Sequence, residues 1–498
     1  MLALGALQTL AFVHTFAWWL PLLCMAALAG AVSTAAPGRA AWLGWCFGTG
    51  WLGAGTWWLF ISLHRYGGLA APLAVLAVAV LAMALALYLA LAMALFARWR
   101  RDRIGIDAPL FAALWMLAEL ARTVVFTGFP WLASGYSQVD APLAGWAPVV
   151  GVTGIGGLCA LIAAVPVFAW PRRRDTAAAL AALAALVALL LAGAALRGLD
   201  FSRSSGRIGV TLVQTDVAQD QKFAAEHMPA ALAWLAFTLQ HAGGDLVVAP
   251  ETAIPLLPQQ LREMLPDYWD ALRERFEDSK QAALIGVPLG DYDVGYTNSV
   301  YGVSAATRGG APYRYDKVHL VPFGEFVPRG FRWFVDLMDI PLGDFARGPL
   351  NAPSFVFDGQ RIAPNICYED LFGVELALRF AAAATAPTIF ANLSNIGWFG
   401  DTSAVAQHLQ ISRMRSLEFQ RPMLRATNTG ATAIIDHRGR VVAMLRPFTR
   451  GVLNGEVDGR VGITPFAWWS ARFGHWPWVA FAALVIAAAR LTPPKPRQ

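Results

Sequence analysis

The sequence predicts two architectures in one chain, an α-helical membrane bundle followed by a layered α/β domain. Of the 498 residues, 57% are hydrophobic and 14% are charged, whereas an average soluble domain carries about 25% charged residues. Charged residues are scarce before Asp200 and ordinary after it. Beyond Asp200, short β-rich runs alternate with helical patterns, which is typical of a layered α/β domain.

The membrane bundle is predicted to contain about eight transmembrane helices, because a spanning helix needs about 20 mostly apolar residues. The first two candidates are short and poorly separated. No basic residue precedes the small-residue stretch at 27–36, so we expect no signal-peptide cleavage there. The candidate spans are 3–17, 19–35, 41–63, 70–97, 107–126, 148–170, 176–197 and 475–491.

Arginine placement predicts the orientation of the bundle. Basic residues collect in cytoplasmic loops, and the arginine-rich runs at 98–103 and 171–175 lie an even number of spans apart. Arg39 and the tail at 493–498 fall on the same side by the same parity. The α/β domain is therefore expected outside the cytoplasm. The predicted parts are an N-terminal bundle of about seven helices (1–199), an extracytoplasmic domain (200–472) and a last helix with a cytoplasmic tail (473–498).

The α/β domain is predicted to alternate strands and helices along its length. Ligand sites in such folds lie outside the carboxyl ends of strands, so polar residues that follow a strand are the first candidates for a site. The predicted strands are 207–214, 245–250, 282–288, 298–304, 361–366, 387–393 and 431–436, and the predicted helices are 221–241, 258–277, 369–383 and 404–424.

Cys367 is the one cysteine in the predicted outer domain, since the other three fall in predicted spans. Exported domains use cysteines in pairs, as disulfides. A single cysteine is therefore either buried filler, the commoner fate of a free cysteine, or a reactive thiol. Cys367 ends a predicted strand and immediately precedes a helical run, where amide dipoles are expected to lower a thiol pKa.

Two further residues have suggestive positions. Glu251 follows the predicted strand in "LVVAPET". Lys317 is one of only four lysines among 39 basic residues. Where arginine is the default, a lysine can mark the need for a compact ammonium beside a reacting oxygen, and an ordinary surface lysine is the alternative.

These residues resemble a known catalytic set. Glu251 in "PET", Lys317 in "YDKVHLVPFGE" and Cys367 in "ICYED" resemble, in order and wide spacing, the Glu–Lys–Cys triad of the nitrilase, or carbon–nitrogen hydrolase, superfamily. Membrane spans on both sides narrow the resemblance to the apolipoprotein N-acyltransferase family. It implies a nitrilase-like α-β-β-α sandwich for the outer domain. Family-like stretches are 127–152, 317–328, 392–402 and 407–436, with departures at Ala249 and Ile396–Gly397.

The resemblance implies acyl transfer from a phospholipid, expected to be phosphatidylethanolamine, to the N-terminal amine of a diacylated apolipoprotein. Cys367 is the implied nucleophile, which carries the acyl chain as a thioester. Glu251 is the implied general base and acid, and Lys317 the implied oxyanion stabiliser, helped by the Tyr368 backbone N–H. No cofactor or metal is expected. The family also implies a monomeric, multi-pass protein of the bacterial inner membrane, with its catalytic domain in the periplasm.

Five residues are implied as supports for this triad. Glu325 resembles the superfamily's second glutamate, which holds the lysine. Tyr368 and Glu369 are expected to position substrate or lysine, and the alternative for Glu369 is an ordinary acid at a helix N-terminus, favoured by the helix dipole. Trp398 and Phe399 are expected on a substrate-facing loop, with simple core aromatics as the competing interpretation.

Two places are candidates for contact with lipid. Extracting an acyl chain into water costs about 0.8 kcal/mol per CH₂, so a site close to the bilayer is favoured. The segment 330–345 is rich in bulky apolar residues, and it is interpreted either as a mobile lid at the membrane or as an internal helix. Pro130 and Trp131, between two predicted spans, are expected to shape a lipid entrance.

Three classes of function are weighed. The first is the lipid acyltransferase, and the second is a membrane-tethered amidase or nitrilase that uses water as acceptor. The third is a membrane scaffold or transporter, against which the intact Glu–Lys–Cys set argues, as does the lack of an obvious run of buried charges in the spans. The net charge of +6 comes largely from arginines near span ends, and no basic patch with interleaved aromatics predicts nucleic-acid binding.

Overall fold

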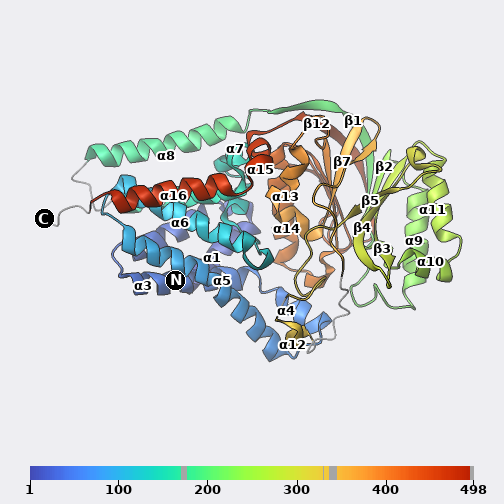
Figure 1. The fold of residues 1–498 in the computed structure, drawn as a ribbon, viewed down its shortest axis with the longest axis horizontal. Helices are drawn as coiled ribbons and strands as arrows, with labels where there is room; N and C mark the ends of the chain where they lie inside the picture. The colour runs from blue at the N-terminus through green and yellow to red at the C-terminus, as the bar shows by residue number, and fades with distance from the viewer. Residues whose placement is uncertain (170–175, 329, 336–344, 494–498) are drawn as a thin grey trace. The chain divides into compact units, whose positions relative to one another are not determined.

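The computed structural model describes residues 1–169, 176–328, 330–335 and 345–493 (Figure 1). The chain forms two compact units. Unit 1 comprises Met1–Leu59, Ala71–Leu199 and Pro465–Gln498, and unit 2 comprises Phe60–Ala70 and Asp200–Thr464. The arginine run at 171–175, nearly all of the tail at 493–498 and most of the apolar segment at 330–345 lie outside the described residues.

Unit 1 consists of helices, as its apolar composition predicts. Five described segments are long and apolar enough to cross a membrane, and α15 with α16, which are bent by 88°, make a sixth if they form one span. The predicted count of about eight spans is therefore not confirmed. The helices are α1 (Leu2–Gln8), α2 (Trp19–Val32), α3 (Pro37–Gly55), α5 (Ala71–Trp99), α6 (Ile104–Val124), α7 (Ala147–Ala169), α8 (Thr176–Leu196), α15 (Pro465–Phe473) and α16 (Trp476–Leu491).

Two predicted spans differ from the helices that form. The run 3–17 breaks after Gln8, where α1 gives way to short 3₁₀ turns. The run 41–63 ends as a regular helix at Gly55. Helix α3 is rich in glycine, and each glycine disfavours a helix by about 1 kcal/mol relative to alanine. A glycine-rich apolar run therefore need not form one uninterrupted helix.

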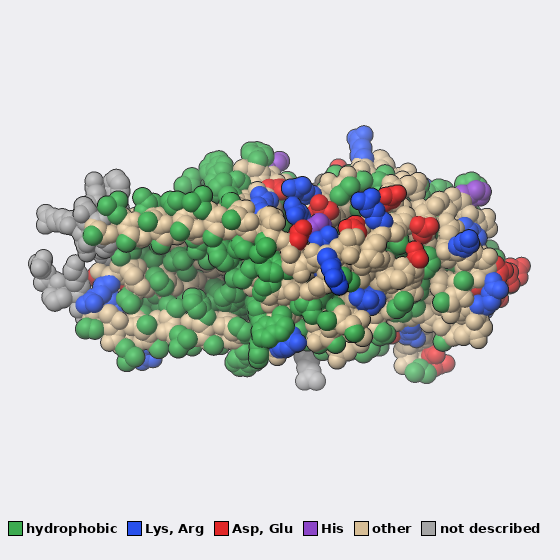
Figure 2. All heavy atoms as spheres, turned by 90° about the horizontal axis from the view of Figure 1, so that it is seen from above, with side chains coloured by type: hydrophobic (Ala, Val, Ile, Leu, Met, Phe, Trp, Pro, Cys, Tyr) green, Lys and Arg blue, Asp and Glu red, His purple; other side chains and the backbone are tan. Residues whose placement is uncertain are grey.

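Small residues let helices of unit 1 approach closely. A Cβ added to Gly48 of α3 would lie 2.9 Å from the Ala86 Cβ of α5, and one added to Gly44 would lie 2.7 Å from the Met93 Cγ. Close packing of this kind is a main source of helix association in a bilayer, where the hydrophobic effect does not drive helices together. The surface of unit 1 is largely hydrophobic on the face that Figure 2 draws.

Three charged side chains of α6, those of Asp107, Glu119 and Arg122, are buried. Glu119 accepts a hydrogen bond from the backbone N–H of Ser134 (3.0 Å), and Arg122 donates to the carbonyl oxygen of Trp131 (2.7 Å). These contacts tie α6 to the loop that follows it. Trp131 and its neighbour Pro130 are buried within unit 1, and their expected role at a lipid entrance stays a prediction.

Unit 2 holds two six-stranded sheets, with strand orders β12-β1-β2-β3-β4-β5 and β11-β10-β9-β8-β7-β6. Strands β1, β2 and β3 run parallel in the first sheet, and β7, β8 and β9 in the second. The carboxyl ends of parallel strands meet at one edge of each sheet. The strands are β1 (Ser202–Gln214), β2 (Leu246–Ala249), β3 (Ala282–Asp291), β4 (Gly295–Val303), β5 (Tyr313–Asp316), β6 (Phe355–Phe357), β7 (Gln360–Ile366), β8 (Ile389–Ser394), β9 (Met423–Thr427), β10 (Ala433–Ile435), β11 (Val441–Met444) and β12 (Gly451–Gly462).

Helices cover the outer face of each sheet (Figure 1). Alternate residues of β1, such as Ile208, Val210 and Leu212, point into a core between the sheets. A second core lies where the first sheet packs against α9, α10 and α11, and Phe419 of α14 packs on Phe390 of β8. This α-β-β-α sandwich confirms the predicted layered fold. The helices are α9 (Met228–Gln240), α10 (Pro258–Met264), α11 (Tyr268–Glu277), α12 (Arg332–Val335), α13 (Gly373–Ala377) and α14 (Ser403–Phe419).

The predicted helix 404–424 is cut short by its C-terminal residues. Helix α14 ends at Phe419 because Gln420 adopts a left-handed conformation (φ 46°), which caps a helix. Pro422 follows, and the residue before a proline disfavours the helical region. The predicted helices 221–241, 258–277 and 369–383 are likewise shorter or divided, and strands β5, β6, β9, β11 and β12 were not predicted.

One segment at the junction of the predicted spans 41–63 and 70–97 belongs to the α/β unit. Phe60–Ala70 lies in unit 2, although the chain on either side of it lies in unit 1. It contains most of α4 (Leu59–Ile61) and the π-helical turn η3 (Ser62–Tyr66). Tyr66 packs edge-on against Trp398, with 5.7 Å between ring centroids. The predicted domain limits place this segment in the bundle.

Candidate functional site

Glu251, Lys317 and Glu325 form one buried charged cluster, which we call the front cluster. Glu251 follows β2 and Lys317 follows β5. The Lys317 Nζ lies 3.2 Å from Glu251 Oε1 and 2.9 Å from Glu325 Oε1. The Lys317 side chain is 1% exposed, and those of Glu251 and Glu325 are 9% and 10% exposed. Two predicted triad members and the predicted supporting acid thus come together.

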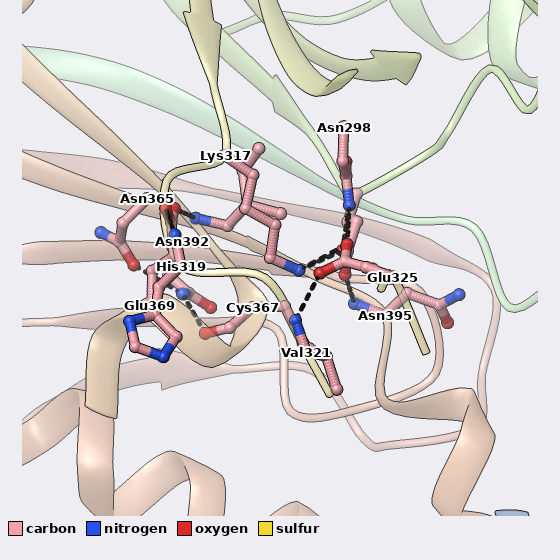
Figure 3. Close-up of polar contacts among 12 residues, drawn as sticks. Asn298, Lys317, His319, Val321, Glu325, Asn365, Cys367, Glu369, Asn392 and Asn395 are labelled. Atoms are coloured by element: carbon pink, nitrogen blue, oxygen red, sulfur yellow. Dashed lines mark hydrogen bonds and ion pairs between the residues drawn. The ribbon is translucent and has the colours of Figure 1, made fainter. Parts of the chain in front are cut away.

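The Asn298 side chain and two backbone N–H groups hold the two acids in place; Figure 3 labels Glu325 with its partners Asn298, Lys317 and Val321. Asn298 Nδ2 donates to one oxygen of Glu251 and one of Glu325, at 2.7 Å each. The other Glu251 oxygen accepts from the Asn395 backbone N–H (2.8 Å), and the other Glu325 oxygen accepts from the Val321 N–H (2.8 Å). Every oxygen of the two carboxylates therefore has a donor, which fixes their orientation.

Charge attraction keeps Glu251 and Lys317 ionised despite their burial. Burial by itself raises the pKa of a carboxyl group and lowers that of an ammonium. Against burial, the Lys317 ammonium and the Asn298 hydrogen bond hold the pKa of Glu251 below its ordinary value. The Glu251 and Glu325 carboxylates, also against burial, hold the pKa of Lys317 above its ordinary value. At neutral pH Glu251 is therefore a carboxylate that can accept a proton.

Cys367 stands at an abrupt turn. It directly follows β7 and begins the 3₁₀ turn η9 (Cys367–Leu371). Its φ is +51°, a conformation that residues other than glycine rarely adopt and that is often found at functional sites. The Cys367 carbonyl oxygen accepts a hydrogen bond from Asn392 Nδ2 (3.1 Å), which supports the turn. The charges of Glu251 and Lys317 both act on the pKa of the Cys367 thiol.

Burial raises the pKa of the Cys367 thiol to about 12, and the Glu251 carboxylate acts in the same direction. Lys317, the Ser394 hydroxyl and the Asn395 N–H act against this rise. The expectation that helix dipoles lower this pKa is therefore wrong, because η9 is one short turn and burial outweighs it. A thiol with this pKa is protonated at pH 7, so it needs a neighbouring base to become a nucleophile.

Glu369 joins the lysine loop to the cysteine turn. One carboxylate oxygen accepts hydrogen bonds from the two backbone N–H groups that directly follow Lys317 (2.6 and 3.2 Å). The other accepts from the backbone N–H that directly precedes Cys367 (2.6 Å) and from the Tyr315 hydroxyl (2.8 Å). Burial raises the pKa of Glu369, and these hydrogen bonds oppose the rise. The contacts favour a positioning role over that of an ordinary acid at a helix N-terminus.

The other predicted supports have different neighbours. Tyr368 is buried among aromatic rings. Trp398 and Phe399 belong to the 3₁₀ turn η11 (Ile396–Phe399) and are half-buried. Phe399 packs with Cys367 against a small apolar cluster, whereas Trp398 contacts Tyr66. Phe399 is thus partly a core residue, and Trp398 meets the segment from between the predicted spans.

A second buried polar cluster, which we call the back cluster, consists of Asp370, His408, Ser412 and Arg425. Arg425 donates to His408 Nδ1 (2.7 Å), so Nε2 carries the ring proton and donates to Asp370 Oδ1 (3.0 Å) and the Cys367 carbonyl (3.3 Å). The Ser412 hydroxyl donates to the other Asp370 oxygen (2.6 Å). The back cluster therefore supports the cysteine turn from within the fold.

The sequence analysis missed Asn298, Asn395, Lys222 and the back cluster. A signal existed for Lys222, because lysine is rare in this chain. Asn298 lies within β4 and Asn395 directly follows β8, and polar side chains in and beside buried strands need hydrogen-bond partners. Nothing in the sequence distinguishes the back cluster from ordinary helix and strand residues, because its members meet only in the folded chain.

The arrangement combines a thiol, a carboxylate that can take its proton, and an ammonium that can stabilise an oxyanion. These are the parts that acyl transfer through a covalent intermediate requires. In the part of the chain that the structure describes, no group of three or more His, Cys, Asp or Glu side chains is arranged to hold a metal ion.

Comparison with known proteins matches both parts of the chain. Residues 4–165 match the apolipoprotein N-acyltransferase N-terminal domain, and residues 209–466 match the carbon-nitrogen hydrolase model. An apolipoprotein N-acyltransferase of Verminephrobacter eiseniae is 53% identical over 485 residues, covering 92% of this chain and 88% of that protein. One of Ralstonia nicotianae is 45% identical over 491 residues, covering 98% and 91%. A solved carbon-nitrogen hydrolase from Helicobacter pylori is 15% identical, with a TM-score of 0.37 over 55% of this chain and 94% of that one.

Proposed function

The chain belongs to the apolipoprotein N-acyltransferase family, and on this premise we propose its reaction. It transfers a fatty acyl chain from a phospholipid, through a thioester on Cys367, to the N-terminal α-amine of an S-diacylglyceryl cysteine. The acceptor is an apolipoprotein, and the product is a triacylated lipoprotein. The observation that carries the proposal is the convergence of Glu251, Lys317 and Cys367, which follow three different strands, at one largely buried place.

The first half of the reaction loads the enzyme. Glu251 takes the thiol proton as Cys367 Sγ attacks the ester carbonyl carbon of the phospholipid. The new C–S bond forms, the ester C–O bond breaks, and Glu251 passes the proton to the departing lysophospholipid oxygen. General acid–base help of this kind is worth about 10²–10⁴ in rate. The high pKa of the thiol explains why the base must lie so close.

The second half of the reaction transfers the acyl chain from Cys367 to the amine. The α-amine nitrogen attacks the thioester carbonyl, and the N–C bond forms while the C–S bond breaks. Glu251 removes the proton from the amine and returns a proton to the Cys367 sulfur, so the enzyme regains its starting state. Because Cys367 first receives the acyl chain from the donor and then passes it to the acceptor, the reaction should follow ping-pong kinetics.

Both halves pass through a tetrahedral intermediate that carries an oxyanion. Lys317 stabilises it together with the Tyr368 backbone N–H, and loss of one such donor costs about 3 kcal/mol in a well-studied protease. Glu325 fixes the position of Lys317, and Asn298 fixes that of Glu251. The site therefore needs little reorganisation as charge develops on the intermediate. Glu369 fixes the backbone on either side of the lysine and the cysteine.

The proposal includes a location and two lipid partners. Unit 1 crosses the bacterial inner membrane, and unit 2 faces the periplasm as a monomeric catalytic domain. The apolar helices of unit 1 support this, since both substrates carry acyl chains that are costly to expose to water. Phosphatidylethanolamine is the proposed donor, and a diacylated apolipoprotein is the proposed acceptor.

Intact mass spectrometry tests the covalent step. Purified protein incubated with phosphatidylethanolamine in detergent should gain the mass of one acyl chain, and this adduct should disappear when a synthetic diacylated lipopeptide is added. Cys367→Ala should form no adduct. Cys367→Ser should give no efficient transfer, since an alkoxide is much harder to generate than a thiolate. An adduct that persists in Cys367→Ala contradicts the proposal.

The same assay separates the acyltransferase from a hydrolase that uses water. With the lipopeptide, the acyl chain should appear on the peptide amine. If the adduct decays at the same rate without the lipopeptide as with it, water is the acceptor and the amidase alternative replaces the proposal.

A further inference from the structure

Lys222 is a second buried lysine beside the site, and the reaction described above does not use it. It lies in the turn at 215–227, between β1 and α9, and is 5% exposed. Its Nζ donates to the backbone carbonyl oxygen of Glu251 (3.0 Å). No carboxylate among the described residues forms an ion pair with it. Burying a charge without an ion-pair partner costs free energy of folding. A buried ammonium of this kind is therefore expected to serve a purpose in its surroundings.

The turn that carries Lys222 is fastened to the site. Asn395, whose backbone N–H binds the Glu251 carboxylate, also donates from Nδ2 to Gln219 Oε1 of the turn (2.9 Å). Asn428 donates to a backbone carbonyl of the same turn (2.8 Å). One residue therefore links the carboxylate of Glu251 to the turn that carries Lys222. Lys222 in turn holds the Glu251 backbone, so the general base is fixed at both its ends.

Lys222 also changes the charge balance of the site. Lys317 alone faces two carboxylates, Glu251 and Glu325, which leaves these three groups with a net charge of −1. The Lys222 ammonium brings the set to zero. Burial lowers the pKa of Lys222 to about 8, and the nearby Glu251 and Cys367 charges act to raise it. Lys222 is therefore charged at neutral pH and loses its charge just above it.

We propose that Lys222 is a positioning residue of this active site, whose buried ammonium fixes the Glu251 backbone and supplies a second positive charge that stabilises the Cys367 anion. It touches neither reacting atom of the substrate and acts through these two residues. The assignment rests on the proposed function only for the identity of the nucleophile. The reactivity of the Cys367 thiol can be measured without any lipid.

Alkylation of Cys367 by iodoacetamide tests the assignment on the full-length protein in detergent, with the modified cysteine identified by peptide mass. At pH 7, Lys222→Met and Lys222→Gln should each slow the alkylation about tenfold, which corresponds to one unit of thiol pKa. Glutamine can still donate to the Glu251 carbonyl but carries no charge, so its effect isolates the charge. Lys280→Met, at an exposed lysine in a loop before β3, should react at the native rate.

The native chain provides a second readout that needs no variant. The alkylation rate should rise tenfold per pH unit up to about pH 8, flatten over about one further pH unit and then rise again, because loss of the Lys222 charge raises the pKa of the Cys367 thiol by about one unit. Glu251 has a lowered pKa and Lys317 a raised one, so both keep their charge in this range. The pKa of Arg425 is lowered from about 12.5 and that of His408 from 6.5. Among the described residues, the charged or titratable groups around Cys367 are Glu251, Lys317, Lys222, Arg425 and His408, together with Glu369 and Asp370 of its own turn.

Two results would overturn the assignment. The first is alkylation of both Lys222 variants within twofold of the native rate, even if their thermal midpoints fall, since that is the behaviour of a purely structural lysine. The second is a native rate that rises through pH 8 without a break, which decides the matter if the variants do not fold. Failure to form an acyl thioester contradicts the proposed function and leaves these alkylation results unchanged, so the two failures are distinguishable.

Discussion

The front and back clusters use similar residue types in opposite ways. Both combine acids with bases; the back cluster contacts the Cys367 carbonyl, and the charges of the front cluster act on the Cys367 thiol. The side chains of Asp370, His408 and Arg425 are all 0% exposed, whereas those of Glu251 and Glu325 are about a tenth exposed. The back cluster therefore has no route to substrate and stabilises the fold. The front cluster keeps acids at the edge of solvent, where a proton can be exchanged.

The largest expected effect on the reaction rate comes from removing the ammonium of Lys317 from the front cluster. Lys317→Met should lower the rate of acyl-thioester formation by about 10²–10³, because it removes an oxyanion donor. Single-turnover mass spectrometry with phosphatidylethanolamine measures this rate, and Lys280→Met serves as the matched control. A loss below threefold would show that the front cluster does not stabilise the intermediate.

Breaking the back cluster should instead lower stability. Asp370→Asn leaves the Arg425 guanidinium without its buried anion, and breaking a buried ion pair in this way costs about 3–5 kcal/mol of unfolding free energy. Thermal unfolding in detergent measures the change, with the exposed Asp293→Asn as control. Folded Asp370→Asn protein should load acyl chain faster than Lys317→Met. If its loading is the slower of the two, the division of roles between the clusters is wrong.

Glu369 connects the two regions, and its substitution should have an intermediate effect. Glu369→Gln replaces one accepting oxygen by an amide NH₂, which then faces backbone donors. The lysine loop and the cysteine turn lose their shared anchor, so acyl loading should fall about tenfold, the equivalent of 1.4 kcal/mol in the barrier. Loading kinetics and the thermal midpoint should be recorded together. If Glu369→Gln forms the acyl thioester at the native rate, Glu369 is an ordinary acid at a helix N-terminus.

Acid should lower the stability of the protein by protonating Glu251 of the front cluster. The pKa of Glu251 is held below its ordinary value of 4.5 in the folded chain, so its stabilising contribution is present above pH 4.5 and is lost as the pH falls through the folded pKa. Between pH 5 and pH 3 the thermal midpoint of the native protein should fall further than that of Glu251→Gln, which cannot titrate. Parallel curves for the two proteins would mean that Glu251 adds nothing to acid sensitivity.

The smallest expected effect concerns the segment Phe60–Ala70 of unit 2. Arg65 and Asp220 form an ion pair there at 3.3 Å, with side chains 61% and 53% exposed. Exposed pairs of this kind are worth about 0.2–1 kcal/mol and weaken with salt. A double-mutant cycle with Arg65→Ala and Asp220→Ala should find a coupling in this range that shrinks in 1 M NaCl. A coupling unchanged by salt would contradict a solvent-exposed pair.

The sequence by itself determined the layered fold and indicated the candidate residues of the site. Alternating strand and helix patterns after Asp200 require a sheet with helices packed on it, because each apolar face must be covered. Residues at strand ends, such as Glu251 and Cys367, were found because parallel strands gather their carboxyl ends at one edge. Local composition suffices for inferences of this kind.

Only the tertiary structure decided how the site is charged and which residues hold it. The Cys367 thiol has a raised pKa, opposite to the expectation from the adjacent helical run, because burial depends on the whole fold rather than on the next turn. Lys222, Asn298 and Arg425 come from distant parts of the chain and meet only when the sheets pack. A sequence shows which groups are present, whereas desolvation and pairing, which set their protonation, depend on distances that exist only in the folded protein.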